Sequence, residues 1–315
     1  MTEPPAVLAA VDWGTTRFRL WLLARDGRVL ARSQGPEGLE AGRTDGFETV
    51  LRHHLGAVSA PTTLPVLICG MAGSREGWVE APYVDVPAPL DGVAKAVVPV
   101  PDSELDVRVV PGLAKRSGER LDVLRGEETQ LIGIAAGLSA GRSRICLPGT
   151  HSKWVTVHDR RVEDFTTYMT GDMYAALSGH SILRHSVAGF DDSVDAGDPA
   201  FTDALQRALA APERFVAELF SIRATGLLHG LTGAAAAARL SGLLIGVEVA
   251  AALRDAPDPA AVTLVANSGM ARLYTAALAA AGATITTVDA DQAVCAGLLN
   301  IALRDDADRL SRKQA

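Results

Sequence analysis

The stretch Val11-Asp12-Trp13-Gly14-Thr15-Thr16 decides the fold of this chain. A short apolar run at 7–11 leads into it and predicts a buried strand. Beyond the turn every second residue from 18 to 22 is apolar, and this period of two predicts a second strand with one buried face. Residues 29–31, after a further turn, predict a third, antiparallel strand. The quoted stretch is therefore the turn of a strand hairpin.

The same pattern returns at Leu147-Pro148-Gly149-Thr150-His151-Ser152-Lys153. An apolar strand is expected at 145–147, just before this turn, and another at 154–157, just after it. Setting Gly149-Thr150 on Gly14-Thr15 places the two hairpins 135 residues apart. We infer an internal duplication at the scale of a domain.

The remaining elements follow from hydrophobic periodicity. Further strands are expected over 66–69, 107–110, 262–265 and 285–288, and helices over 47–55, 127–138, 173–183, 201–209, 215–225, 243–253, 270–281 and 292–303. The segment 71–106 is rich in Pro, Gly and Asp and shows little periodicity, so we expect a surface or ligand-facing loop there.

Two lobes follow from this order of elements. No linker rich in Gly, Ser and Pro separates them, so we expect close packing with a cleft between the lobes. The boundary is expected at 137/138, which gives an N-terminal lobe of residues 1–137 and a C-terminal lobe of residues 138–315. The last helix is expected to pack back on the first lobe.

Composition excludes several classes of function. The formal net charge of −7 argues against a nucleic-acid partner, which needs a basic surface. Three widely spaced cysteines support neither a disulfide framework nor a zinc site. The N-terminus lacks the pattern of a signal peptide, and the Ala-rich stretch 233–240 is expected to be too short to cross a membrane. These features indicate a cytoplasmic protein that associates with neither membrane nor nucleic acid.

The first turn has the chemistry of an anion site. Gly14 permits close approach of a ligand, Thr15 and Thr16 add hydroxyl donors, and Arg17 follows directly. Asp12 would repel phosphates unless a divalent cation lay between them, and Mg²⁺ is the metal that suits this setting. The alternative is a plain hairpin turn with local hydrogen bonds.

The second turn offers similar donors at Gly149, Thr150, His151 and Ser152, and Lys153 adds a positive charge. It lacks the acid, because Leu147 stands at the position of Asp12. For Lys153 the alternative is a solvated surface lysine, and for His151 a structural histidine. Two matched turns could hold a polyphosphate from both lobes.

Two other places can carry chemistry. The turn Asn267-Ser268-Gly269 lies between an expected strand and helix, where the sugar or phosphate of a nucleotide can bind. Glu127 and Glu128 begin an expected helix, and a carboxylate there could act as general base toward a substrate hydroxyl. The alternative is that both acids only complement the helix dipole.

The order of these motifs resembles the acetate and sugar kinase, heat-shock and actin superfamily, whose lobes are ribonuclease-H-like. More narrowly, the chain is similar to the 2-dehydro-3-deoxygalactonokinase family. The segments that carry this resemblance are Cys69-Gly70-Met71-Ala72-Gly73-Ser74-Arg75, Arg125-Gly126-Glu127-Glu128-Thr129-Gln130, Leu147-Pro148-Gly149-Thr150-His151-Ser152-Lys153-Trp154, Met169-Thr170-Gly171-Asp172 and Ala266-Asn267-Ser268-Gly269.

The resemblance implies transfer of the ATP γ-phosphoryl group to the 6-hydroxyl of 2-dehydro-3-deoxy-D-galactonate, with Mg²⁺ and with adenosine against 267–272. It favours Glu127 as the base, because this residue takes the place of the acid in a Gly-Asp-Gln-Gln motif of related kinases. Glu128 remains a rival. Asp12 is expected to organise the metal.

The resemblance leaves the segment 69–90 for the sugar acid. An arginine suits its carboxylate, so Arg75 and Arg17 are candidates, with Ser74 and Trp78 beside them. Asp172 is expected to be a helix N-cap. The alternatives are a kinase of 2-dehydro-3-deoxy-gluconate or another sugar acid, and a non-catalytic ATP-binding switch protein. A homodimer is a possible assembly state.

Overall fold

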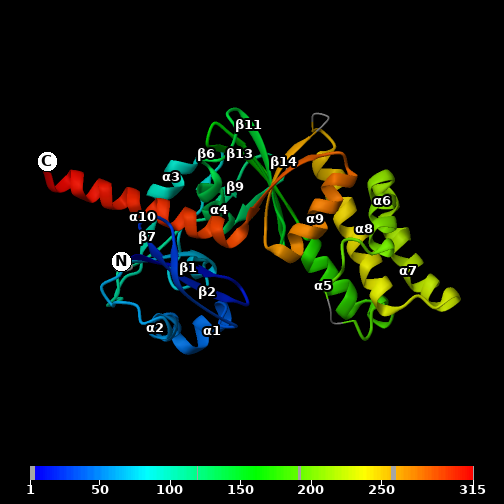
Figure 1. Cartoon of the computed structure of the whole chain (residues 1–315), viewed down its shortest axis with the longest axis horizontal. Helices are drawn as coiled ribbons and strands as arrows, with labels where there is room; N and C mark the ends of the chain where they lie inside the picture. The colour runs from blue at the N-terminus through cyan, green and yellow to red at the C-terminus, as the bar shows by residue number, and fades with distance from the viewer. Residues whose placement is uncertain (1–3, 119, 191–192, 257–259, 315) are drawn as a thin grey trace. The chain divides into compact units, whose positions relative to one another are not determined.

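The computed structural model describes residues 4–118, 120–190, 193–256 and 260–314, and of residues 305–314 only the backbone. The chain divides into two compact units (Figure 1). The first unit runs to Arg142 and also takes in residues 156–165 and the C-terminal helix from Ala290. The second unit comprises residues 143–155 and 166–289. The first unit thus extends five residues beyond the expected boundary at 137.

The first unit is built on a six-stranded sheet with the order β3-β2-β1-β4-β8-β7. β1 lies antiparallel to β2 and parallel to β4, and β4 lies parallel to β8. The strands are β1 (Ala6–Trp13), β2 (Phe18–Ala24), β3 (Val29–Gly35), β4 (Val66–Gly70), β7 (Val98–Pro99) and β8 (Val107–Val109). The three-stranded hairpin region that the sequence predicts is confirmed.

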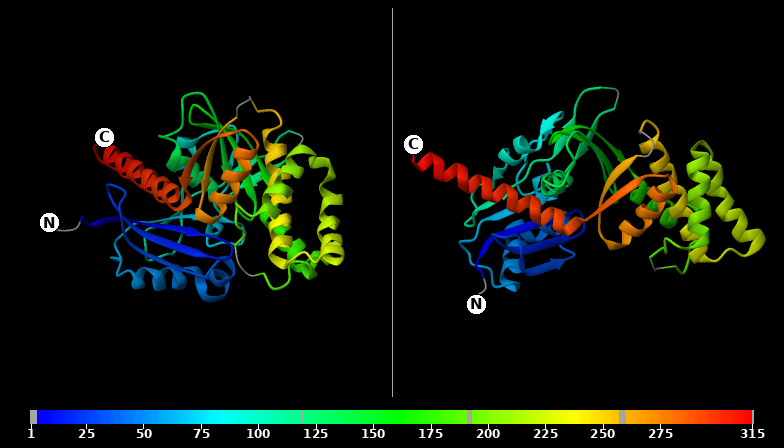
Figure 2. Two further views of the ribbon diagram at one scale, coloured as in Figure 1. Left: turned by 45° about the vertical axis from the view of Figure 1, so that its right-hand side comes forward. Right: turned by 45° about the horizontal axis from the view of Figure 1, so that its top comes forward.

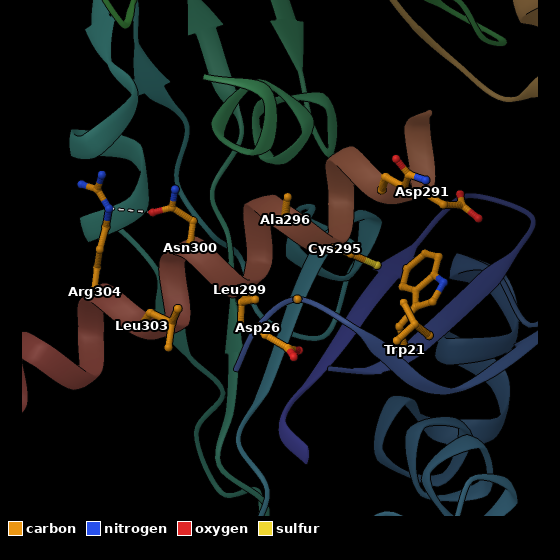
Figure 3. A pocket seen from close by; sticks show the side chains of 12 residues that line it. Trp21, Asp26, Asp291, Cys295, Ala296, Leu299, Asn300, Leu303 and Arg304 are labelled. Carbon is orange, nitrogen blue, oxygen red and sulfur yellow. Dashed lines mark hydrogen bonds between the residues drawn. The ribbon is translucent and has the colours of Figure 1, made fainter. Parts of the chain in front are cut away.

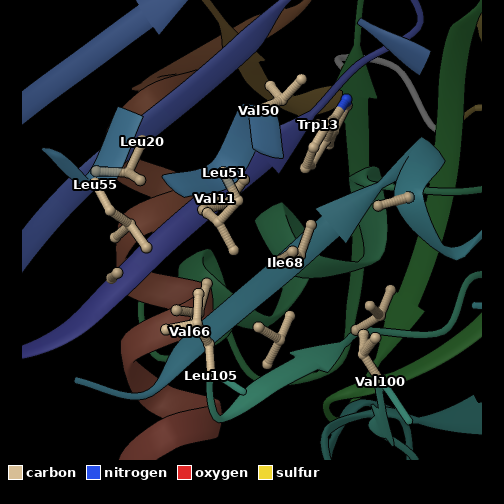
Figure 4. Close-up of a cluster of buried hydrophobic side chains, with 14 of the residues drawn as sticks. Val11, Trp13, Leu20, Val50, Leu51, Leu55, Val66, Ile68, Val100 and Leu105 are labelled. Carbon is tan, nitrogen blue, oxygen red and sulfur yellow. The ribbon is translucent and has the colours of Figure 1, made fainter. Parts of the chain in front are cut away.

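A hydrophobic cluster covers one face of this sheet (Figure 4). In this cluster Leu51 and Leu55 of α2 (Phe47–Ala57) pack with Val11 and Ile68 of the sheet. The short helix α1 (Leu39–Ala41) and a π-helical turn over 42–46 precede α2.

The opposite face is also covered, by α4 (Glu127–Ile134) and α10 (Ala290–Gln314). The expectation that β2 buries one face is therefore wrong: Trp21, on its second face, is only 5% exposed. Glycines let the two helices approach, because a Cβ on Gly297 would overlap the Thr129 carbonyl. The expected helix over 127–138 ends four residues early, at Ile134.

The segment 71–106 is not the irregular loop that we expect from its composition. It contains a 3₁₀ turn (Met71–Gly73), β5 (Val84–Asp85), β6 (Ala88–Pro89), α3 (Leu90–Lys95) and β7. β5 joins β9 (Leu113–Lys115) and β10 (Asp122–Leu124) in a small sheet. The segment is ordered because its few apolar residues, such as Ala81 and Leu90, are buried.

The second unit repeats the plan of the first. Its strands have the order β15-β14-β11-β12, which matches the order β8-β4-β1-β2. They are β11 (Arg142–Leu147), β12 (Ser152–His158), β14 (Ala261–Ala266) and β15 (Thr284–Asp289), and β14 is parallel to both β11 and β15. β13 (Arg161–Tyr168) begins in the first unit, and there its residues Arg161 and Val162 pair with β6. An α/β fold with two ribonuclease-H-like lobes is confirmed.

The helices of the second unit are α5 (Thr170–His180), α6 (Pro199–Ala210), α7 (Phe215–His229), α8 (Gly233–Leu253) and α9 (Ser268–Ala280). Single 3₁₀ turns lie at Ile182–His185 and Pro212–Arg214. Helices α6, α7 and α8 run side by side (Figure 2). A Cβ on Gly242 of α8 would overlap the Phe201 carbonyl, so this glycine permits the close approach of α6.

Helix α8 corrects the expectation about the Ala-rich stretch. That stretch and the helix expected over 243–253 form one helix of 21 residues with a mean hydropathy of 1.6, which is long and apolar enough to cross a membrane. However, 67% of its most apolar window is buried inside the protein, and it contains the buried Glu248. The core helix of a globular domain has these same properties.

Candidate active site

An acidic and basic cluster lies where β1 ends. Asp12 pairs with Arg19 across the β1–β2 hairpin, and Arg19 also pairs with Asp291 in the first turn of α10. Burial raises the pKa of the Asp12 carboxyl, and the Arg19 guanidinium partly offsets this rise. Neither Arg19 nor Asp291 follows from the sequence, because Asp291 is 272 residues away from Arg19.

Gly70 brings the end of β4 against this carboxylate. Its φ of +90° lies in the region that favours glycine. A Cβ there would lie 2.5 Å from the Trp13 carbonyl oxygen and 3.3 Å from Asp12 Oδ1. A larger residue would therefore displace Asp12 from its place at the strand ends.

The turn after β1 leaves several donors exposed. The Gly14 N–H donates to the Arg17 carbonyl at 2.8 Å, which closes the hairpin. Thr15, Thr16 and Arg17 are all exposed. Their hydroxyl and guanidinium groups are thus available to a ligand next to Asp12.

Two neighbouring glutamates at the start of α4 have opposite environments. Gly126 has a φ of +104°, and a Cβ there would lie 3.6 Å from Gly70 Cα, so α4 begins beside the end of β4. Glu127 is partly exposed, and its Oε2 accepts the Arg125 N–H at 3.0 Å. Glu128 is fully buried and accepts from the Gly126 N–H at 2.6 Å and the Thr129 hydroxyl at 3.0 Å.

Burial, reinforced by the charge of Glu127, raises the pKa of Glu128 to about 8. Glu128 is therefore mostly protonated at neutral pH, and a substrate cannot reach it in this structure. Of the two acids only Glu127 has access to solvent. This arrangement favours Glu127 as a group that can accept a proton from a ligand.

The residues expected to bind the sugar acid differ in their surroundings. Arg75 is exposed. Trp78 is partly buried and packs on Phe47, with ring centroids 6.0 Å apart, so much of its ring supports the core. The Ser74 hydroxyl is buried and has no hydrogen-bond partner in the part of the chain that the structure describes.

Arg125 lies against the same segment and was missed as a binding residue. Its Nη2 donates to the Ala81 carbonyl at 2.8 Å, and its guanidinium carbon lies 4.4 Å from the centre of the Tyr83 ring. Its Nε and Nη1 are buried and make no hydrogen bond to any described residue. Gly73 makes room for it, since a Cβ there would lie 2.7 Å from Nη1. A buried cation without full compensation marks a place for an anion.

In the second unit, the turn at 149–153 divides into an exposed and a buried part. Thr150 and His151 are exposed, and His151 Nε2 lies 3.4 Å from Asp172 Oδ2. Ser152 is fully buried, and its hydroxyl bonds to the Tyr274 hydroxyl at 2.9 Å. Lys153 is only 5% exposed, so the alternative of a solvated lysine is wrong.

The start of α5 packs directly on this turn. The Asp172 N–H donates to the Thr150 carbonyl at 2.9 Å, and a Cβ on Gly171 would lie 2.6 Å from the Gly149 carbonyl oxygen. The helix begins at Thr170 with Met169 before it. Asp172 is therefore a first-turn residue, and the expectation that it is the N-cap is wrong.

A pocket of about 330 Å³ lies beside the turn at 267–269. Asn267 caps α9, with its Oδ1 accepting the Met270 N–H at 3.4 Å, and Ser268 is exposed. The walls are largely apolar and come from α5, α8 and α9. The lining residues are Thr170, Gly171, Tyr174, Ser193, Val194, Ser241, Leu244, Ile245, Asn267, Gly269, Met270 and Leu273.

A second cavity, of about 940 Å³, lies in the first unit between the β2–β3 turn and α10 (Figure 3). Trp21 and Asp26 line one side and α10 residues such as Leu299 and Arg304 the other. Arg304 Nε donates to Asn300 Oδ1 at 2.7 Å. The cavity contains none of the residues that the sequence predicts for the site.

The donor set suits a metal ion that arrives with a nucleotide. Among the described residues no group of three or more His, Cys, Asp and Glu side chains could hold an ion by itself. Mg²⁺ is typically held by one or two carboxylates together with substrate phosphates and water. Asp12, at the ends of β1 and β4 and beside the exposed threonines, fits that requirement.

The repeated strand order and the glycine–threonine turns define a member of the sugar kinase, heat-shock and actin superfamily. More narrowly, the chain belongs to the 2-keto-3-deoxy-galactonokinase family, whose model matches residues 12–301. The family predicted from the sequence is thus confirmed.

Relatives agree with this assignment. A protein of Rhizobium meliloti named a probable 2-dehydro-3-deoxygalactonokinase is 50% identical over 290 residues, which cover 92% of this chain and 94% of the relative. The 2-dehydro-3-deoxygalactonokinase of Escherichia coli is 36% identical over 301 residues, 93% of this chain and 96% of the relative. A crystal structure from Sinorhizobium meliloti, described as that of a putative 2-dehydro-3-deoxygalactonokinase protein, has a TM-score of 0.89 at 49% identity; the match covers 95% of this chain and 98% of that chain.

Proposed function

We propose that this protein transfers the γ-phosphoryl group of ATP to the 6-hydroxyl of 2-dehydro-3-deoxy-D-galactonate and forms the 6-phosphate and ADP. Membership of the family and the enzyme name of its relatives support the substrate. The observation that carries the chemistry is the pair of acids at the start of α4, of which Glu127 is accessible and Glu128 is buried. The substrate is a small sugar acid, and the protein acts in the cytoplasm without nucleic acid or membrane.

Glu127 takes the proton of the acceptor hydroxyl. As that oxygen bonds to the γ-phosphorus, the bond from the γ-phosphorus to the bridging oxygen breaks and ADP leaves with the electron pair. In phosphoryl transfer most of the rate comes from positioning and charge neutralisation. Asp12 would hold Mg²⁺, which would neutralise charge on the phosphates. Arg19 and Asp291 fix the orientation of Asp12.

Each unit offers one turn with donors that suit the phosphates of ATP. In the first unit these are Gly14, Thr15, Thr16 and Arg17, and in the second unit they belong to the turn at 149–153. In the second turn the Thr150 hydroxyl and the His151 ring are exposed, and the buried Lys153 ammonium group adds positive charge beside them, since its Nζ donates to the His151 carbonyl at 3.2 Å. The Ser152 side chain points inward, toward Tyr274. Adenosine occupies the 330 Å³ pocket beside Asn267, Ser268 and Gly269, whose apolar walls suit a planar base.

The sugar acid binds beside the segment that contains Ser74, Arg75 and Trp78. Among the arginines near this segment, Arg125 is the best counter-ion for the substrate carboxylate, because two of its buried nitrogens lack a described partner. The exposed Arg75 is the second candidate. The unpartnered Ser74 hydroxyl can donate to the carboxylate or the adjacent keto group. A homodimer is compatible with this proposal.

A coupled assay of ADP release tests the proposal. The panel contains 2-dehydro-3-deoxy-galactonate, its gluconate epimer, other 2-keto-3-deoxy acids and common neutral sugars. We expect the galactonate to give the highest kcat/KM. Preference for the gluconate would change the assigned substrate within the same chemistry. ATP binding without stimulation of ADP release by any acid would indicate a non-catalytic switch protein.

A further inference from the structure

A buried carboxylate lies behind the second phosphate turn. Glu248, in the middle of α8, is only 2% exposed. It accepts hydrogen bonds from Trp154 Nε1 at 2.8 Å, from the Tyr274 hydroxyl at 2.7 Å and from the Thr170 hydroxyl. The Tyr274 hydroxyl is also bonded to Ser152 at 2.9 Å. Three side chains from three other elements therefore donate to Glu248, and Ser152 is linked to it through Tyr274.

Each of these elements forms part of the proposed nucleotide site. Ser152 belongs to the turn at 149–153, and Trp154 follows it on β12. Thr170 begins α5 and lines the 330 Å³ pocket. Tyr274 lies on α9, two turns beyond the 267–269 segment that lines the same pocket. Glu248 is thus bonded to the phosphate turn and to two walls of the adenosine pocket.

The nature of the donors makes this carboxylate hard to replace. Trp154 can only donate, so Glu248 must present an acceptor to it. The two hydroxyls can turn, but their carbon atoms are fixed by burial at 8% exposure or less. A buried polar network is stabilising only when all its members are satisfied, and it then defines one arrangement of the elements that it connects. An apolar core would hold the same elements without fixing the register of the turn.

We propose that Glu248 is a positioning residue of the nucleotide site: it holds the phosphate turn through Tyr274 and Ser152, and the start of α5 through Thr170, in the geometry that ATP and ADP require. It does not touch the nucleotide. This inference rests on the proposed function, because it concerns the same nucleotide site. Its effect is expected on nucleotide affinity and not on affinity for the sugar acid.

The test compares wild type with Glu248→Gln and Tyr274→Phe by calorimetric titration with Mg·ADP. Glutamine has the size of glutamate but offers one acceptor oxygen and one amide group, so at least one buried donor loses its partner. We expect the Kd for ADP to rise about tenfold or more in Glu248→Gln, the loss typical of an unmet buried hydrogen bond. Phenylalanine at 274 keeps the ring but disconnects Ser152, and it should raise the Kd in the same direction.

The control is Ile222→Ala, which removes a buried side chain from the cluster between α6, α7 and α8. It should lower the melting temperature yet leave the Kd for ADP within about twofold, as for a change away from the site. The KM for the sugar acid should also stay within about twofold in Glu248→Gln. A Kd within that range in both Glu248→Gln and Tyr274→Phe would overturn the inference and leave Glu248 a purely structural residue.

If Glu248→Gln does not fold, the Kd for ADP of Tyr274→Phe and Thr170→Val decides whether the inference holds, since each variant removes a single hydroxyl. If wild type does not bind ADP, the proposed nucleotide site is wrong. In contrast, if wild type binds ADP and all the variants bind it with the same Kd, only the proposed role of Glu248 is contradicted.

Discussion

Replacing Glu128 by glutamine should make the protein more stable at neutral and mildly alkaline pH. The carboxyl is fully buried, and its pKa rises from the ordinary 4.5 to about 8, mainly because of burial. In the folded protein Glu128 is therefore protonated at pH 7, whereas in the unfolded chain it is ionised above pH 4.5. Folding must bind a proton at this site.

The magnitude follows from the two pKa values. Between pH 4.5 and pH 8 the folded state carries one proton more than the unfolded state, so the free energy of unfolding falls by about 1.4 kcal/mol per pH unit. The contribution of the protonated Glu128 carboxyl to the free energy of unfolding is fully present below pH 4.5, and it is lost as the pH rises through 8. The whole loss is about 5 kcal/mol, of which about 3 kcal/mol has occurred at pH 7.

Glutamine avoids this loss because it does not titrate. Its amide oxygen can accept the Gly126 N–H that Glu128 accepts at 2.6 Å, and its amide nitrogen can donate to the Thr129 hydroxyl. We expect the free energy of unfolding of Glu128→Gln to exceed that of wild type by about 2–5 kcal/mol at pH 8–9. At pH 5 the difference should be less than about 1 kcal/mol.

The measurement is urea unfolding of both proteins at five pH values from 5 to 9, followed by circular dichroism. Groups that titrate in both proteins cancel in the difference of the two unfolding free energies. A difference that does not change with pH would refute the argument. So would a glutamine variant that is less stable than wild type at pH 9.

Three further predictions concern the first unit. Glu127→Gln should lower kcat by about 10²- to 10⁴-fold in the coupled assay and leave ADP binding intact; near-normal turnover, with collapse in Glu128→Gln, would move the base by one residue. Arg125→Lys should raise the KM for the sugar acid about tenfold or more through loss of a bidentate contact, and an unchanged KM would place the carboxylate elsewhere. Gly297→Ala would push a methyl group into the Thr129 carbonyl and should cost about 1–3 kcal/mol in urea unfolding, so unaltered stability would contradict the close approach of α4 and α10.

The sequence predicts the fold well where the signal is local. A strand, a glycine–threonine turn and a second strand have a recognisable period, so both hairpins and the repeated order of elements could be predicted. The segment 71–106 could not. Its apolar residues, among them Ala81 and Leu90, are buried singly in short elements that establish no period.

The candidate site is predictable only at the level of the backbone. Gly14 and Gly149 mark the two turns, but the direction of each side chain depends on distant residues. The Ser152 side chain points inward because its hydroxyl forms a hydrogen bond with the hydroxyl of Tyr274, which lies 122 residues later in the chain. Arg125 belongs to a motif that the sequence shows, but the sequence gives it no role. Only the structure shows that its Nε and Nη1 are buried and lack a hydrogen-bond partner among the described residues.

The two turns stand at matching places in the repeated strand order but differ in where the nearest carboxylate lies. Both units place a glycine–threonine turn after the first strand of the same sheet order, yet only the first retains an acid at the strand end, Asp12. In the second unit Leu147 occupies that position, and the nearby carboxylate, Glu248, lies behind the turn and accepts from its neighbours. If both acids faced the phosphates, their charges would add to those of ATP and require a second cation. With Asp12 as the one acid at the end of a first strand, the proposed function needs a single Mg²⁺ at the first turn, and the second turn would present only donors.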